Sequence, residues 1–124
     1  SYELYAEGRK VYETLYRVIR LADAGISPSS SGSQASAADI LTLSPLERVD
    51  VILQYGQCIE REKAYAEACE IYAEATAMMR SIMEKKMKAG WKDQAEEKEW
   101  RSKEEEVKEH LVFVSYSTYA SILS

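Results

Sequence analysis

A long stretch with few helix breakers constrains the fold of this chain more than any other feature. After Pro45 there is no further proline, and the only glycine before Gly90 is Gly56. The stretch opens with Ser44-Pro45-Leu46-Glu47, which is a capping box with proline at the first helical position. One unbroken helix from Pro45 to Ala89 would extend roughly 65 Å, about twice the width of a domain of this size. We therefore expect two helices, separated by a turn in the polar segment 60–63.

The second of these helices, predicted over 64–88, has an unusually broad apolar face. On a helical wheel its apolar and small residues fall within an arc of roughly 140°. They are Tyr65, Ala68, Ile71, Tyr72, Ala75, Met78, Met79, Ile82 and Met83. Contact with a single neighbouring helix needs a narrower stripe, so this helix is predicted to contact two elements. Gly90 follows at the position where helices commonly end.

Two further helices are predicted, one at each end of the chain. Residues 2–24 show a helical stripe, and Gly25 follows as a favourable C-cap. Residues 93 to about 120 continue the helical periodicity, although 112–116 also has strand propensity. The domain prediction is an N-terminal helix over 1–25, a Ser-rich flexible loop over 26–43 and a three-helix bundle over 44–124. The predicted fold class is therefore all-α, an antiparallel bundle with an added N-terminal helix.

Composition and charge exclude several classes of function. A chain of 124 residues has room for one domain, and a net charge of -5 gives no basic surface for nucleic acid or anionic lipid. No apolar run approaches the roughly 20 residues that cross a bilayer, so we expect no direct membrane insertion. Two cysteines and no apolar signal segment favour reduced thiols and a cytoplasmic location.

The residues that could carry chemistry are few. Cys58, Cys69 and His110 could form a thiol or metal site, but the interpretation favoured here is that the cysteines are small apolar residues on helix faces. The carboxylates of 96–106 alternate with basic residues at helical spacing, which is typical of a solvated, self-paired face. We therefore predict no enzymatic activity, no cofactor and no metal.

One segment resembles a known family. Residues 65–75 have the pattern Tyr-x-x-Ala-x-x-x-Tyr-x-x-Ala, and an apolar Met79 follows one turn later. This resembles the second helix of a microtubule-interacting and trafficking (MIT) domain, in which small Ala residues let helices approach closely. Tetratricopeptide repeats share much of the same spacing. The segment Ala68-Cys69-Glu70-Ile71 is also similar to the C-terminal MIT domains of autophagy-initiating kinases.

The resemblance implies a protein–protein interaction module. It would bind an amphipathic helix or short tail peptide between the second and third core helices, with partners such as the tails of ESCRT-III subunits or an autophagy scaffold. The width of the apolar arc predicts a trough for that peptide. Its predicted peptide-binding residues are Ile71, Met78, Ile82, Val107 and Leu111. The alternative is a structural or oligomerising bundle without a peptide groove, which would form a homo-oligomer.

Overall fold

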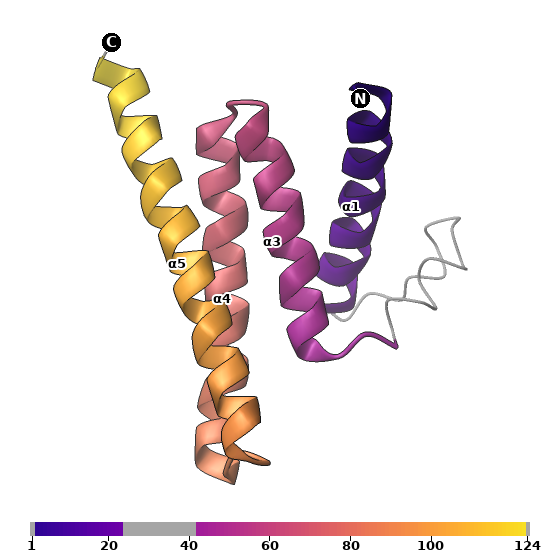
Figure 1. Ribbon diagram of the computed structural model, residues 1–124, viewed down its shortest axis with the longest axis vertical. Coiled ribbons are helices and arrows are strands. Elements are labelled where there is room, and N and C mark those ends of the chain that lie inside the picture. Colours follow the sequence, from indigo (N-terminus) through magenta and orange to yellow (C-terminus); the bar gives the residue numbers. More distant parts are fainter. Residues whose placement is uncertain (1, 24–41, 124) are drawn as a thin grey trace. The chain divides into compact units, whose positions relative to one another are not determined.

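The described part of the protein, residues 2–23 and 42–123 of a computed structural model, is all-helical, as predicted (Figure 1). It contains four helices: α1 (Tyr2–Asp23), α3 (Pro45–Arg61), α4 (Tyr65–Ala89) and α5 (Gln94–Leu123). Their bounds lie within about three residues of the sequence predictions. The predicted flexible loop, 26–43, lies outside the described residues except for its last two, and so does the predicted C-cap Gly25.

Helix α3 begins and ends where the sequence predicts. The amide N–H of Glu47 donates to Ser44 Oγ at 3.2 Å, and the amide N–H of Ser44 donates to Glu47 Oε1 at 3.1 Å. These two bonds are the reciprocal pair of a capping box. The turn after the helix is built on Lys63, which has a left-handed φ of 63° although it is not a glycine. The predicted turn in 60–63 is therefore confirmed.

Helices α4 and α5 are joined by a short turn with capping at both ends. Gly90 has a φ of 94° and its N–H donates to the Lys86 carbonyl at 2.7 Å, which ends α4. The Asp93 carboxylate then accepts the Glu96 N–H at 2.8 Å and caps α5. Lys86 Nζ lies 3.4 Å from Glu96 Oε1. This half-buried ion pair joins the last turn of α4 to the first turn of α5.

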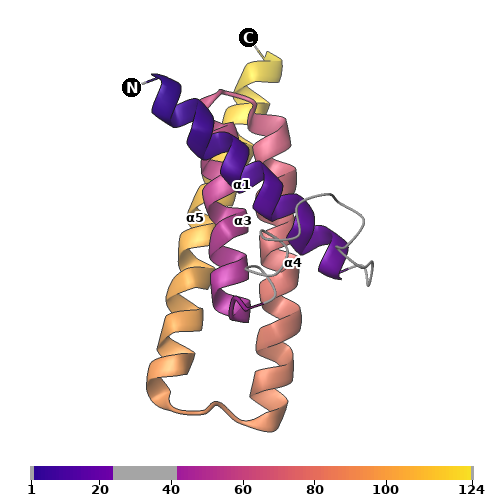
Figure 2. The same ribbon diagram turned by 90° about the vertical axis from the view of Figure 1, so that its right-hand side faces the viewer.

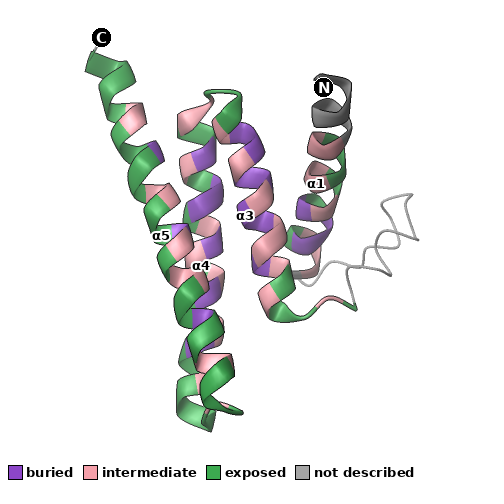
Figure 3. Cartoon of the chain, in the orientation of Figure 1, coloured by how far each residue is buried: buried purple, intermediate pink, exposed green. Residues whose placement is uncertain are grey.

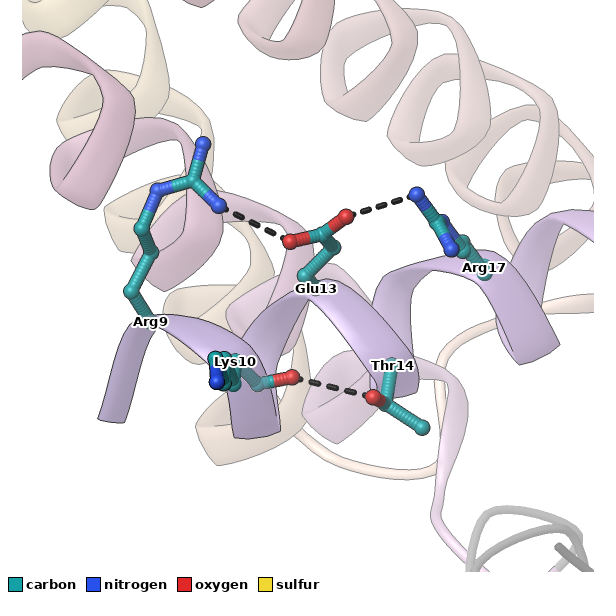
Figure 4. A network of polar contacts seen from close by, with 5 residues as sticks. All are labelled: Arg9, Lys10, Glu13, Thr14 and Arg17. Carbon is teal, nitrogen blue, oxygen red and sulfur yellow. Dashed lines mark hydrogen bonds and ion pairs between the residues drawn. The ribbon is translucent and has the colours of Figure 1, made fainter. Parts of the chain in front are cut away.

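The chain divides into two compact units, residues 1–55 and residues 56–124, and α3 contributes to both. In the N-terminal unit the rings of Tyr16 and Tyr55 lie 4.8 Å apart between centroids, and both side chains are buried. Along α1, the half-buried Glu13 accepts hydrogen bonds from Arg9 at 2.8 Å and Arg17 at 2.6 Å (Figure 4). Pairs of this kind, four residues apart, stabilise a helix.

In the C-terminal unit α4 and α5 lie side by side and run antiparallel (Figures 1 and 2). The predicted apolar arc of α4 supplies most of the core, as Figure 3 shows. The buried residues of the two helices are Ala68, Ile71, Tyr72, Ala75, Met79 and Met83 with Trp100, Val107 and Val114. Segment 112–116 is helical despite its strand propensity, because one face of the helix packs into this core.

Candidate functional site

The C-terminal unit has an open hollow between α4 and α5, with a volume of about 330 Å³. Its lining combines two methionines with charged residues of both signs: Arg80, Met83, Glu84, Met87 and Lys88 from α4, and Arg101 and Glu104 from α5. The volume lies at the small end of the range for ligand sites, about 300–1,000 Å³. We call this feature the methionine hollow.

The two methionines give the hollow an apolar surface at two depths. Met83 is buried, whereas Met87, one turn further along α4, is 58% exposed. An unbranched thioether side chain adapts its shape to irregular apolar groups, and for that reason methionine is common at binding surfaces. The hollow can therefore take one or two apolar side chains of a partner.

Charged groups surround this apolar surface. Arg101 lies 3.7 Å from Glu97 and 3.8 Å from Glu104, and Lys88 lies 3.6 Å from Glu84. Arg80 is exposed and has no hydrogen-bond or ion-pair partner among the described residues. The hollow thus offers one cation that is not already neutralised by a carboxylate.

A partly buried polar network lies in the same unit and connects three helices. Glu60 of α3 accepts a hydrogen bond from the Tyr72 hydroxyl of α4 at 2.9 Å and lies 3.3 Å from His110 Nδ1 of α5. Gln57 Nε2 lies 3.3 Å from His110 Nε2. An amide nitrogen only donates, so the geometry suits a ring that accepts from Gln57 at Nε2 and donates from Nδ1 to Glu60.

The Tyr72 side chain is the centre of this network. Its ring is fully buried and lies 5.4 Å from the His110 ring, centroid to centroid. Burial raises the pKa of Tyr72 well above its ordinary value of 10.0, and its hydrogen bond to the Glu60 carboxylate raises the pKa further. The network therefore fixes a neutral phenol against α5 and sets the rotation of α5 about its own axis.

The residues considered for thiol or metal chemistry do not converge. His110 contacts Glu60 and Gln57, whereas Cys69 Sγ lies 3.6 Å from Ser115 Oγ. Cys58 is buried. Within residues 2–23 and 42–123, no group of three or more His, Cys, Asp or Glu side chains is arranged to hold a metal ion.

In the same part of the chain, no helix has the length and apolar character needed to cross a membrane.

The structure distributes the five predicted peptide-binding residues between core and surface, and none of them lines the methionine hollow. Ile71 and Val107 are buried, so their side chains offer no surface to a ligand in this conformation. Met78, Ile82 and Leu111 are half-buried. At 100° per residue, Met78 lies about 180° around α4 from Met87. The hollow and the predicted trough therefore lie on different sides of α4.

The sequence contained one signal for the methionine hollow. Met83 belongs to the predicted apolar arc, and Met87 follows it by one turn on the same side of α4. The arc alone does not show that α5 leaves space beside these two residues.

Comparisons with protein-family models, with curated proteins and with solved structures found no match to this chain. The MIT resemblance of residues 65–75 therefore stays a prediction.

Proposed function

We propose that this chain is a non-catalytic protein–protein interaction module that binds an amphipathic helix or short tail peptide in the methionine hollow. The observation that supports this proposal is the hollow itself, in which two methionines at different depths are rimmed by charges of both signs. Helix-in-groove recognition needs an apolar groove for a few anchoring side chains and polar groups at its edges. The two adjacent helices α4 and α5 supply both.

The charges of the hollow favour a particular kind of peptide. Arg80 has no carboxylate partner among the described residues, whereas Arg101 and Lys88 already face Glu104 and Glu84. A peptide with a leucine or methionine for the hollow and an Asp or Glu one turn away would pair with Arg80. Such a complex buries only a few anchoring side chains, and part of the free energy that they contribute offsets the entropic cost of association. We therefore expect a micromolar dissociation constant. It should rise with salt, because salt screens the charged contacts.

The MIT resemblance of residues 65–75 gives this proposal a biological context. It implies membrane trafficking or autophagy, with tails of ESCRT-III subunits or an autophagy scaffold as partners. We expect such a tail to bind at the methionine hollow. That place involves Met83 and Met87, beyond the end of the motif, so the resemblance and the hollow can be tested separately.

An NMR titration tests the proposal directly. The probe is a helical peptide of about 14 residues with leucines on one face and glutamates beside them. We expect amide shifts of the labelled protein to concentrate at 80–88 and 101–104, and Met87→Asp to weaken binding at least 10-fold without loss of helical circular dichroism. Val11→Asp, which places the same charge at an exposed apolar position of α1, serves as the matched control.

A second variant separates the hollow from the trough predicted by the sequence. Met78→Asp changes a half-buried methionine on the other side of α4. If binding requires Met87 and tolerates Met78→Asp, the peptide occupies the methionine hollow. If only Met78→Asp abolishes binding, the peptide lies in the predicted trough instead. A titration without shifts in α4 or α5 would contradict peptide binding in this unit altogether.

One further observation favours the alternative of an oligomerising bundle. The C-terminal half of α5 exposes large apolar side chains on the face opposite the core. This face lies on a different part of α5 from the residues that line the methionine hollow, so the two functions do not compete for the same residues.

A further inference from the structure

The C-terminal half of α5 is free of formal charge. Residues 110–123 contain no Asp, Glu, Lys or Arg, whereas eleven of the sixteen residues 94–109 are charged. A surface helix normally keeps charged or polar side chains on the face opposite the core. The segment 110–123 lacks charged side chains on any face, which is typical of a helix that is covered on more than one side.

Large apolar side chains lie on both the core-facing and the solvent-facing side of this segment. Val114 is buried against the core, while six large apolar side chains on the other side are between 52% and 76% exposed. We call these six residues the α5 apolar face: Val112, Phe113, Tyr116, Tyr119, Ile122 and Leu123. Together they expose roughly 800 Å², more than the largest apolar patch of a typical monomer, about 300–600 Å². The C-terminal half of α5 is exposed over most of its surface in Figure 3.

Part of this face extends beyond the neighbouring helix. Helix α5 has 30 residues and α4 has 25. Helix α4 ends at the turn where α5 begins, so the two helices run back along each other from that turn. At 1.5 Å per residue the last five residues of α5 extend about 7 Å beyond the start of α4. Figures 1 and 2 both show the C-terminal end of α5 projecting beyond α4. Helix α4 therefore cannot cover Ile122 and Leu123.

The spacing of the exposed residues indicates that the partner covering the α5 apolar face is a helix. Val112, Tyr116, Tyr119 and Leu123 follow one another at steps of four, three and four. This is the spacing of residues that pack knobs-into-holes against another helix. At 100° per residue these four lie within about 60° of one another, with Phe113 and Ile122 on the two sides.

The same residues are arranged symmetrically along the helix. About the midpoint between Ser117 and Thr118, Val112 is equivalent to Leu123, Phe113 to Ile122 and Tyr116 to Tyr119. If a second copy of this segment lies antiparallel on the first, each apolar residue therefore meets an apolar residue, and each pair occurs twice. Self-complementarity of this kind is what a two-fold symmetric interface requires.

Charge favours the same arrangement. Segment 94–109 holds seven acidic and four basic residues, a net charge of -3. Antiparallel packing of two copies through 112–123 places these acidic segments at opposite ends, whereas parallel packing would place them side by side. A membrane surface is a poor occupant, because helices that lie on anionic lipid carry Lys or Arg beside the apolar face and this segment has none.

We propose that the α5 apolar face binds a second copy of this chain, forming an antiparallel two-fold dimer in which Tyr116 packs against Tyr119 of the other copy. The exposed area of roughly 800 Å² per copy matches the area that each partner of a standard-size interface buries. The methionine hollow lies outside this interface, so a dimer would present two hollows. Paired sites on one particle would bind a multivalent partner more tightly than a single site does.

Sedimentation equilibrium of the full chain at concentrations from about 1 to 100 μM tests the proposal. We expect a concentration-dependent rise toward twice the chain mass of 14.1 kDa. Tyr116→Lys should raise the dimer dissociation constant at least 30-fold, because symmetry places the change in the interface twice. The control is Val11→Lys, an equally exposed apolar position in α1, which should leave the dimer intact.

A mixing experiment tests the antiparallel register. Tyr116→Lys and Tyr119→Glu should each be monomeric alone, and an equimolar mixture should dimerise, since Lys then faces Glu across the interface. In a parallel pair each position faces itself, so the mixture would give no rescue. If Tyr116→Lys lowers the helical circular dichroism, Ile122→Lys in the projecting turn makes the same test outside the region packed on α4.

Three results would overturn the proposal. The first is a wild-type chain that stays monomeric throughout the concentration range, including one that binds lipid vesicles instead. The second is a dimer that persists in both Tyr116→Lys and Ile122→Lys. The third is a mixture of the Lys and Glu variants that remains monomeric, which would exclude the antiparallel register.

Discussion

The two halves of α5 differ in what they place opposite the core. In segment 94–109, buried Trp100 and Val107 are backed by a surface of alternating charges. In segment 110–123, Val114 is buried, and the opposite side of the helix exposes Val112, Tyr116 and other apolar residues. The first half of α5 is therefore amphipathic, whereas the second half has large apolar side chains on its exposed side as well as in the core. A charged exposed side is typical of a solvated helix, and an apolar one is typical of a protein–protein interface.

The composition of the two segments causes this difference, and the packing of α5 determines which side chains it exposes. The network of Tyr72, Glu60 and His110 contacts α5 at the residue where its charged half ends. Since the His110 ring faces α3 and α4, side chains about half a turn away, such as Val112, point outward. The α5 apolar face is therefore exposed while Val114 packs in the core.

The largest effect is expected from a charge placed in the core of the apolar half. Val114 is fully buried, so Val114→Asp should lower the free energy of unfolding by about 3–5 kcal/mol, because an uncompensated carboxylate is desolvated. The matched change Val112→Asp lies two residues away at a position that is 60% exposed. In dilute protein it should cost less than about 0.5 kcal/mol in urea unfolding. Equal losses would mean that the two faces of this segment are not distinct.

A smaller effect is expected where α3 approaches Tyr72. A methyl group on Gly56 would lie 2.5 Å from Tyr72 Cε1, and that ring is held by Glu60 and His110. Gly56→Ala should therefore cost about 1–3 kcal/mol of unfolding free energy, reduced in part by the better helix propensity of Ala. Gly8→Ala in α1 meets nothing within 4 Å and should stabilise by about 0.5–1 kcal/mol. Thermal unfolding of both variants should show shifts of opposite sign.

The network itself should contribute about 1 kcal/mol and a dependence on pH. Tyr72→Phe removes the hydrogen bond to Glu60 and leaves the ring in place. Because the pKa of Tyr72 is raised in the folded protein, the unfolded chain loses the phenolic proton first. Above pH 10 the wild type should lose stability by up to about 1.4 kcal/mol per pH unit from this group. Unfolding of Tyr72→Phe between pH 8 and 11 should show a shallower fall, and identical slopes would exclude a buried neutral phenol at this position.

The helices and their ends could be predicted because the signals are local. Ser44 with Glu47, Gly90 and Asp93 each act within four residues of their own position, and the caps at Ser44 and Gly90 form as predicted. The turn at Lys63 carries no glycine and was predicted from the length that one unbroken helix would have and from the polar segment 60–63. These features depend on backbone groups that any helix end must satisfy.

The candidate site could not be predicted in the same way because it depends on distances between helices. The wheel shows that α4 has a broad apolar arc, but not which part of it a neighbour covers. Ile71 and Val107 were therefore expected beside a ligand, and the structure shows that both are buried. Glu60 and His110 are 50 residues apart, so no local pattern joins them. The absence of charge after Glu109 is visible in the sequence and would have indicated the α5 apolar face.

The smallest effect is expected from the ion pairs of the charged half. Arg101 lies 3.7 Å from Glu97 and 3.8 Å from Glu104, and all three side chains are more than a third exposed. Exposed pairs of this kind contribute little, so Arg101→Gln should lower the free energy of unfolding by no more than about 0.5 kcal/mol. Lys86→Gln provides the comparison, because its half-buried pair with Glu96 joins α4 to α5 and should be worth about twice as much. Urea unfolding in low and high NaCl measures the loss of unfolding free energy in each variant. Salt should reduce the loss in Arg101→Gln more than that in Lys86→Gln, because exposed pairs are screened more strongly than partly buried ones. A loss above 1 kcal/mol for Arg101→Gln would show that charge pairing stabilises the first half of α5, much as apolar packing stabilises the second.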